Sequence, residues 1–471
     1  MTTALTPDLC IVGAGAAGLA VAAGAVQMGA DVVLVERGLM GGDCLNFGCI
    51  PSKSLLAGAR LADAARRAAA LGVVAGNLEV DFAGAAEGIE QVIAAIAPND
   101  SEERFAGLGV KVLRDEAHFM GPRAIRAGEV EVRPRRFVIA TGSHPAVPPI
   151  PGLAAVPYLT NETIFANRKR PDHLIVIGAG PIGIEMAQAH CRLGARVTVL
   201  DIGPVLPRDD PELVARLTGH LAGEGIAIRP AIEIAGIERD GDGIAATLAG
   251  GAKITGSHLL VATGRRPTIE RLDLAAAGIE ATATGITVDA RMRTTNRRVF
   301  AIGDVAGGPQ FTHIALYHAG IVIRNALFRL PAKADYRALP WVTYTDPELA
   351  QVGLTEAAAR GAGHQVHVLR WPFAENDRAQ TERDTEGVVK VVTRRNGRLL
   401  GASILGAGAG DLILPWALAI AQNLKIGAIA NLIVPYPTRG EASKRAAGCY
   451  YTPTLFSPRT RRLVRLLARF G

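Results

Sequence analysis

Apolar residues near the start of the chain follow a strand–helix–strand pattern that returns later. Residues 9–12 are apolar and lead into a glycine-rich turn, an alanine-rich stretch follows, and a second apolar run ends at Glu36. The same pattern starts again at residue 174 and ends at Asp201, and in both copies the acid lies 23 positions after the first glycine. This order of elements predicts two βαβ units.

Both turns have the spacing G-x-G-x-x-G between a strand and a helix. The glycines are Gly13, Gly15 and Gly18 in the first copy and Gly178, Gly180 and Gly183 in the second. The first glycine permits a tight turn, the second lets the backbone approach a pyrophosphate, and the third allows close helix–strand packing, while the acid accepts hydrogen bonds from ribose hydroxyls. One such motif is a weak signal, but two in the right context indicate two dinucleotide-binding folds.

Each copy has a later apolar strand that ends in the residues ATG. Thr141 and Gly142 end this strand in the first copy, and Thr263 and Gly264 end it in the second. From first glycine to threonine there are 128 residues in the first copy and 85 in the second, so the first copy is longer. The stretch GGDCLNFGCIPSKSLL and an alanine-rich helical region at 54–105 fall in this longer copy, which puts two cysteines beside the first dinucleotide site.

The rest of the pattern completes the domain plan. A strand at 299–302 leads to Gly303 and Asp304, an acid that can reach a cofactor across the strand ends or cap the next helix. From about residue 341, strands and a long apolar helix pair predict an α+β domain suited to dimerisation. We therefore predict an α/β protein with two Rossmann-like dinucleotide-binding domains at 1–150 and 151–270, a return segment at 271–340 that completes the first, and a C-terminal dimerisation domain at 341–471.

Composition narrows the class of protein. Of 471 residues, 49% are hydrophobic and 20% are charged, as in a globular protein with several cores. The net charge is +7, but the arginines are scattered, so we do not expect nucleic-acid binding. The N-terminus lacks the pattern of a signal peptide, and no apolar run reaches the roughly 18 residues of a membrane span. We expect a cytoplasmic protein, in which a disulfide among the five cysteines is functional rather than structural.

The spacing of Cys44 and Cys49 alone allows a structural disulfide, a metal site or electron transfer. A metal site would need a second C-x-x-C pair or a histidine cluster, so we predict none. Cys10 and Cys191 lie in apolar segments and are expected to be packing residues.

Together these residues resemble the flavin-dependent pyridine nucleotide–disulfide oxidoreductases, which include dihydrolipoamide dehydrogenase, glutathione reductase and mercuric reductase. The resemblance covers nearly the whole chain and rests on both nucleotide motifs, GGDCLNFGCIPSK, both ATG strands, AIGD at 301–304 and TDPELAQVGLTE at 345–356. It implies a homodimeric enzyme that passes electrons from NADH through FAD to Cys44–Cys49, and then to a disulfide, dithiol or thiol-bound metal acceptor. The alternatives are a metal reductase similar to mercuric reductase, or a scaffold or sensor with weak redox activity.

The resemblance also assigns the nucleotide sites. The first copy would bind FAD, with Glu36 at the adenosine ribose and Asp304 at the ribityl or phosphate region. The second would bind NAD(H), because Asp201 would repel the 2′-phosphate of NADP(H), and Arg265 could face the adenosine phosphates. The predicted cofactor-binding residues are Gly13, Gly15, Gly18, Glu36, Gly42, Lys53, Thr141, Gly142, Gly178, Gly180, Gly183, Asp201, Gly264, Arg265, Gly303, Asp304 and His313.

The catalytic groups follow from the same resemblance. Cys49 would be the flavin-facing thiol and Cys44 the thiol that exchanges with substrate, which requires an available thiolate. Lys53, paired with Glu185, would favour negative charge on the reduced flavin. The alternative is that both are solvated helix charges. His313 could hydrogen-bond near the flavin.

The chain departs from the family near its C-terminus. Where the family has a histidine that the partner subunit supplies as general base, this chain has Tyr436, and Glu441 stands at the family's glutamate position. A phenol with a pKa near 10 is a poor base at neutral pH, so we expect slow oxidation of dihydrolipoamide. Mercuric reductases also carry a tyrosine here, but this chain has only Cys449 in place of their terminal cysteine pair.

Two further features have no counterpart in the family pattern. Asp43 replaces the threonine before Cys44, and either disfavours the neighbouring thiolate or caps the motif helix. The segment 459–469 has five arginines and no acid, with leucines at helical spacing. We expect an extra helix there that docks on the dimer or makes a peripheral contact with a membrane or an acidic partner.

Overall fold

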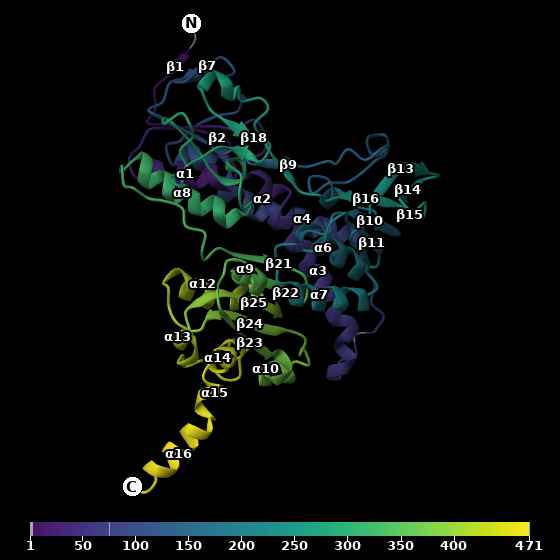
Figure 1. The fold of residues 1–471 in the computed structure, drawn as a ribbon. Helices are drawn as coiled ribbons and strands as arrows, with labels where there is room; N and C mark the ends of the chain where they lie inside the picture. The colour runs from purple at the N-terminus through teal and green to yellow at the C-terminus, as the bar shows by residue number, and fades with distance from the viewer. Residues whose placement is uncertain (1–2, 75, 471) are drawn as a thin grey trace.

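The chain is built around three large sheets, and the computed structural model describes residues 3–74 and 76–470 (Figure 1). The first sheet is parallel and contains, in spatial order, β20 (Val299–Ala301), β8 (Arg136–Ile139), β2 (Leu9–Val12), β3 (Val32–Val35) and β4 (Lys111–Leu113). Successive side chains point to opposite faces, so Leu9 and Ile11 face helices α1 (Ala16–Gln27) and α8 (Thr312–Ala326), while Cys10 faces away. Both faces are buried, which explains why the strands are continuous apolar runs.

A smaller sheet covers the opposite face of the first sheet. Its strands are β1 (Thr3–Leu5), β7 (Val130–Val132), β6 (Ala124–Ala127) and β5 (Ala117–Gly121). Cys10 is fully buried between the two sheets, so its predicted packing role is confirmed.

The second large sheet repeats this plan. It is parallel and contains β12 (Ala227–Arg229), β11 (Arg196–Leu200), β10 (His173–Ile177) and β16 (His258–Val261). Helices α6 (Pro181–Arg192) and α7 (Pro211–Gly223) cover one face. Three antiparallel strands cover the other, namely β13 (Ile234–Asp240), β14 (Gly243–Leu248) and β15 (Lys253–Gly256). The two predicted βαβ units are therefore present, and Cys191, within α6, packs against the core.

The additional residues of the first copy form a bridge between the two regions. The predicted helical region at 54–105 is divided into α3 (Cys49–Arg67), α4 (Phe82–Ile96) and α5 (Glu102–Gly107). Leu55, Leu56 and Ala59 of α3 share a core cluster with Met186 and Ala189 of α6. This packing fixes the first residue of α3, Cys49, relative to the second nucleotide fold.

The third sheet is antiparallel, as expected for the C-terminal α+β region. Its strands are β21 (Pro340–Thr343), β22 (Glu348–Gly353), β25 (Leu399–Gly406), β24 (Val388–Arg394) and β23 (Val366–Pro372). The predicted long apolar helix pair is wrong, because the segment forms the short helices α11 (Ala409–Leu412), α12 (Leu414–Ala421) and α13 (Gly427–Ala430). Asn423, which follows the end of α12, has a φ of 54°, the left-handed conformation that terminates a helix.

The chain ends in a helix, α16 (Pro458–Leu467), that extends away from the third sheet (Figure 1). The helix predicted from the leucine spacing is therefore present. Among the described residues, no helix combines the length and apolar character needed to cross a bilayer.

Candidate active site

One large cavity, of about 1770 Å³, lies where the two parallel sheets meet the third sheet. Its walls include the carboxyl ends of β2, β8 and β20 from the first sheet and of β16 from the second, the edge where α/β folds bind ligands. The predicted residues that line it are Gly13, Gly15, Glu36, Gly42, Cys44, Cys49, Lys53, Thr141, Gly142, Gly180, Glu185, Asp201, Gly264, Arg265, Gly303, Asp304 and His313. The fold thus brings most of the predicted site to one cavity.

The first and third glycines of each motif act through the backbone. Gly13 and Gly178 have φ values of 105° and 114°, and an added Cβ would lie 2.4 Å and 2.3 Å from a carbonyl oxygen of the neighbouring strand. At Gly18 and Gly183 an added Cβ would lie 1.8 Å and 1.9 Å from the carbonyl oxygen of the motif's first glycine. Three of these, Gly18, Gly178 and Gly183, are not among the residues that line the cavity, and their role is close packing: Gly178 against the end of the neighbouring strand, and Gly18 and Gly183 between helix and turn.

The second glycines and the acids form the open parts of the two motifs. An added Cβ at Gly180 would meet nothing within 4 Å, and one at Gly15 would meet only a backbone carbon at 3.8 Å, so a ligand has room to approach. Glu36 accepts two backbone N–H hydrogen bonds, both of 2.6 Å, and Asp201 accepts the equivalent two, of 2.6 and 2.7 Å. These contacts fix both carboxylates at the cavity wall, as a dinucleotide ribose requires.

The two cysteines lie together at the cavity. Cys44 lies in α2 (Gly42–Asn46) and Cys49 begins α3, and both thiols are free. The hydrogen bond that the Cys44 thiol donates lowers the pKa of Cys49 to about 6 against the opposing effect of burial, with help from Thr312, whose hydroxyl is 3.3 Å away, and from Lys53. The same hydrogen bond raises the pKa of Cys44. One proton is therefore shared by the pair, and Cys49 is the thiolate.

We expect the reduced protein to gain one thiolate as the pH rises through about 6, against roughly 8.5 for an ordinary cysteine. Thiolate ultraviolet absorbance and the rate of alkylation of Cys49, followed between pH 4 and 10, measure this change. Lys53→Met should move the transition to higher pH, because one positive charge is lost. A transition at the pH of an ordinary thiol in the unmodified protein would contradict the assigned hydrogen bond.

Lys53 and Glu185 form the predicted ion pair. Lys53 Nζ is 2.7 Å from Glu185 Oε2, and the backbone N–H of Tyr344 donates to Glu185 Oε1 at 2.9 Å. The alternative of two solvated helix charges is wrong, because Glu185 is only 4% exposed. Lys53 also lies 4.6 Å from the centre of the Tyr344 ring. The pair joins α3 to α6, and Glu185 fixes the Lys53 ammonium group at the cavity wall.

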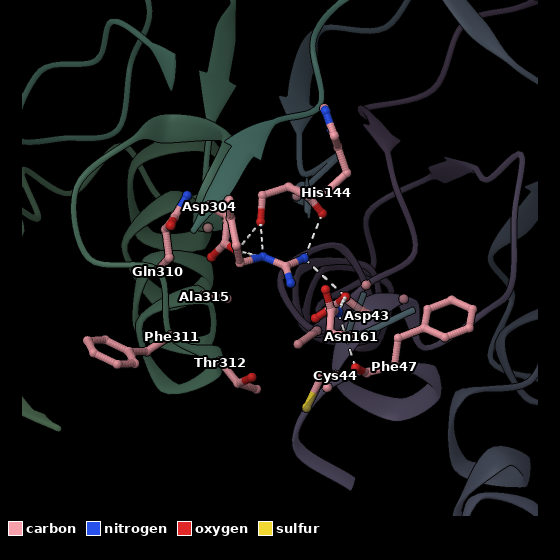
Figure 2. Close-up of a pocket in the computed structure, with 18 of the residues that line it drawn as sticks. Asp43, Cys44, Phe47, His144, Asn161, Asp304, Gln310, Phe311, Thr312 and Ala315 are labelled. Atoms are coloured by element: carbon pink, nitrogen blue, oxygen red, sulfur yellow. Dashed lines mark hydrogen bonds and ion pairs between the residues drawn. The ribbon is translucent and has the colours of Figure 1, made fainter. Parts of the chain in front are cut away.

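Asp43 is held by an ion pair with a residue of the second nucleotide region (Figure 2). Arg265 Nη2 is 3.0 Å from Asp43 Oδ1, and the side-chain amide of Asn161 donates to the same oxygen at 3.0 Å. The helix-cap interpretation is wrong, because the N-cap of α2 is Gly41 and no side chain caps that helix. Asp43 does disfavour a thiolate, but at Cys49, whose pKa its charge raises slightly against the dominant lowering effects.

Arg265 also connects Asp43 to Asp304, and both acids are labelled in Figure 2. Arg265 Nε donates to Ser143 Oγ at 2.7 Å, and that hydroxyl donates to Asp304 Oδ2 at 2.6 Å. Asp304 lies within a short 3₁₀ turn whose N-cap is Ile302, so it is not a helix cap. These contacts use Arg265 Nε and Nη2, and a contact of this side chain with a nucleotide phosphate stays a prediction.

Tyr436, Glu441 and His313 make other contacts within the chain. Tyr436 lies in the C-terminal region that contains the third sheet, is 70% exposed and is not among the residues that line the cavity. Its hydroxyl donates to Asp377 Oδ2 at 2.8 Å. That hydrogen bond raises the pKa of Tyr436. Glu441 pairs with Arg445 at 2.8 Å. His313 lines the cavity, but its Nε2 bonds to a backbone carbonyl at 2.9 Å, which occupies that nitrogen.

Five residues with contacts at these sites were not predicted: Ser143, Asn161, Thr312, Tyr344 and Asp377. Ser143 and Thr312 adjoin the predicted residues Gly142 and His313, so their position was a usable signal. Asn161, Tyr344 and Asp377 carry no local motif, and only the tertiary fold brings them to their partners.

Comparison with known proteins gives a consistent result. Residues 7–319 match the family described as pyridine nucleotide-disulphide oxidoreductase, and residues 339–447 match its dimerisation domain. A mercuric reductase of Streptomyces lividans is 39% identical over 454 residues, which cover 93% of this chain and 95% of that protein. A dihydrolipoyl dehydrogenase of Geobacillus stearothermophilus is 34% identical over 455 residues, which cover 94% and 96%.

Two solved structures are also similar. The Cu(II) complex of the HOCl-induced flavoprotein disulfide reductase RclA from Escherichia coli has a TM-score of 0.85 at 28% identity, covering 93% of this chain and 98% of that one. LpdA from Mycobacterium tuberculosis has a TM-score of 0.86 at 26% identity, covering 95% and 99%.

Proposed function

Because this chain belongs to the pyridine nucleotide–disulphide oxidoreductase family, we propose that it uses NADH, FAD and the Cys44–Cys49 pair to reduce a disulfide substrate. The family uses FAD with NAD(P)H, and the match to its dimerisation domain supports a homodimer. The observation that carries the proposal is the pair of touching thiols, one with a pKa of about 6, in a cavity shared by two dinucleotide folds.

The residues of the first fold suit FAD. Gly15 leaves the backbone open to a pyrophosphate, Glu36 is fixed at the cavity wall for a ribose, and Asp304 lines the same cavity, where it accepts a hydrogen bond from Ser143. The chemistry that FAD supplies when bound is to accept a hydride from NADH and to transfer two electrons to a disulfide. The role of this chain is to hold Cys49 as a thiolate and to keep the charge of Lys53 at the cavity.

The thiols then act by exchange with the substrate. The Cys44 thiol passes its proton to the Cys49 thiolate, and the resulting Cys44 thiolate attacks one sulfur of the substrate disulfide. A mixed disulfide forms, and the first product leaves as a thiolate that takes the proton back from Cys49. The Cys49 thiolate attacks the Cys44 sulfur, which closes the Cys44–Cys49 bond and releases the second product as a thiolate. The substrate gains two electrons and the pair loses two.

The first test is an anaerobic titration of the purified holoenzyme with NADH. We expect uptake of four electrons per FAD, two on the flavin and two on the cysteines, with long-wavelength absorbance from a thiolate beside the flavin. Uptake of only two electrons without that band would exclude the dithiol function and favour the scaffold or sensor alternative.

We expect NADH to be preferred over NADPH by about 100-fold in kcat/KM, because Asp201 would lie beside the 2′-phosphate, and like charges at such distances cost several kcal/mol. Steady-state rates with both nucleotides measure the ratio. Asp201→Ser should reduce it to about tenfold or less. Glu36→Ser, the matched change in the first copy, should weaken FAD binding without changing the ratio.

A metal-reducing activity is the second candidate. The similarity to a mercuric reductase and to the Cu(II) complex of a disulfide reductase favours it, as does a tyrosine at 436. In the described residues no cluster of three or more histidine, cysteine or acidic side chains forms a metal site, so the metal would bind as substrate to the two thiols. NADH oxidation that depends on Hg(II) or Cu(II), and is lost in Cys44→Ser, would support it.

A cytoplasmic location, which supplies reduced thiols and NADH, also stays a proposal.

A further inference from the structure

The helix α16 begins beyond the part of the chain that matches the family. The match to the dimerisation domain ends at residue 447, whereas α16 starts after Ser457, whose Oγ accepts the backbone N–H of Thr460 at 3.2 Å. Pro458 occupies the first helical position, which fixes the start of the helix. In Figure 1 this helix lies at the yellow end of the chain, clear of the three sheets.

The helix has two chemically opposite faces. At 3.6 residues per turn, one face of α16 carries Leu463, Leu466 and Leu467, and the opposite face carries Arg461, Arg462 and Arg465. Arg459 in the first turn lies on the leucine side, and Arg469 and Phe470 follow the end of the helix. The three leucines are 50–58% exposed and Phe470 is 81% exposed. An amphipathic helix normally buries its apolar stripe against a core, but the apolar stripe of α16 is exposed in the structure of this chain.

The charge of this segment identifies what covers it. No acidic residue follows Glu441 in the sequence, so the polar face of α16 is purely cationic. Guanidinium groups bind phosphate oxygens in a bidentate manner, and their cationic face adjoins an apolar one. A second copy of the chain, with a net charge of +7, offers less charge complementarity than an anionic bilayer.

We propose that α16 binds the surface of an anionic phospholipid bilayer, with its leucine face in the interface and its arginines against the lipid phosphates. Such binding is peripheral, and it attaches the enzyme through a segment remote from the catalytic cavity. Each homodimer carries two such helices, which strengthens attachment wherever both reach the same surface.

The test is sedimentation of the holoenzyme with vesicles of phosphatidylglycerol and phosphatidylcholine, and with vesicles of phosphatidylcholine alone. We expect binding to the anionic vesicles only, and its loss at high salt. The double variant Arg461→Gln/Arg465→Gln should lower the partition coefficient about 25-fold, since each arginine near the surface contributes about fivefold. The matched variant Arg123→Gln/Arg239→Gln, which changes two exposed arginines elsewhere, should bind as the unmodified enzyme does.

Three results would overturn the proposal: no binding to anionic vesicles at low salt, equal binding to neutral vesicles, or equal losses in the two double variants. Deletion of residues 458–471 adds a separate check. If the deletion converts the dimer to a monomer, a second copy of the chain covers the helix instead. If the dimer and its NADH-dependent flavin reduction persist while vesicle binding is lost, the bilayer assignment stands.

Discussion

Cys49→Ser is expected to abolish disulfide reduction, lowering kcat by at least about 10³-fold, because the nucleophile that closes the cysteine pair is gone. The variant should still bind FAD, since none of the glycines or acids of the first motif is changed. An anaerobic NADH titration should then end at two electrons per FAD. Its reduced form should also lack the long-wavelength band, because the thiolate with a pKa of about 6 has been removed.

Cys44→Ser is the matched control for this result. A serine at 44 retains a hydroxyl donor for the Cys49 sulfur, so Cys49 should remain a thiolate and give the long-wavelength band even before NADH is added. Disulfide reduction should be lost equally. If the two variants had the same spectrum, the assignment of Cys49 as the flavin-facing thiol and Cys44 as the exchanging thiol would be wrong.

The nucleotide-binding folds were predictable because backbone geometry leaves little choice at their glycines. Gly13 and Gly178 have positive φ values and no room for a Cβ, so any sequence with this fold shows the same spacing. The acids at Glu36 and Asp201 are fixed by equivalent hydrogen bonds, which explains why their offset is the same in both copies. Repetition within one chain made this local signal reliable.

The network around Asp43 was not predictable, because its partners are distant in the sequence. Locally, Asp43 beside the start of a helix has the features of an N-cap, and the pattern cannot distinguish that role from an ion pair. Arg265 and Asn161 come from the second nucleotide-binding region, and only the packing of α3 against α6 brings that region to the cavity.

The prediction of a long apolar helix pair failed for the opposite reason. The local backbone conformation of Asn423 ends a helix that hydrophobicity alone would continue.

Tyr436→His is expected to raise the rate of dihydrolipoamide oxidation by about 10²-fold, the usual effect of a positioned general base. Imidazole has a pKa near 6.5 and accepts a thiol proton at neutral pH. The hydrogen bond to Asp377 raises the pKa of the Tyr436 phenol, so the phenol stays protonated. Steady-state oxidation of dihydrolipoamide with NAD⁺ measures the change. An unaltered rate would show that residue 436 does not limit this reaction.

The same chemistry gives the opposite expectation for disulfide reduction. A protonated phenol is suited to donate a proton to a departing substrate thiolate, so Tyr436→Phe should slow reduction while leaving the NADH titration at four electrons per FAD. Glu441 is available to orient a histidine at 436, because its ion-pair partner Arg445 is 59% exposed and such a pair contributes about 1 kcal/mol or less. Faster dihydrolipoamide oxidation in Tyr436→His, together with slower disulfide reduction in Tyr436→Phe, would show that Tyr436 favours reduction over oxidation in the exchange between the cysteines and the substrate. Equal effects of both variants in both directions would assign Tyr436 a structural role at the dimer interface instead.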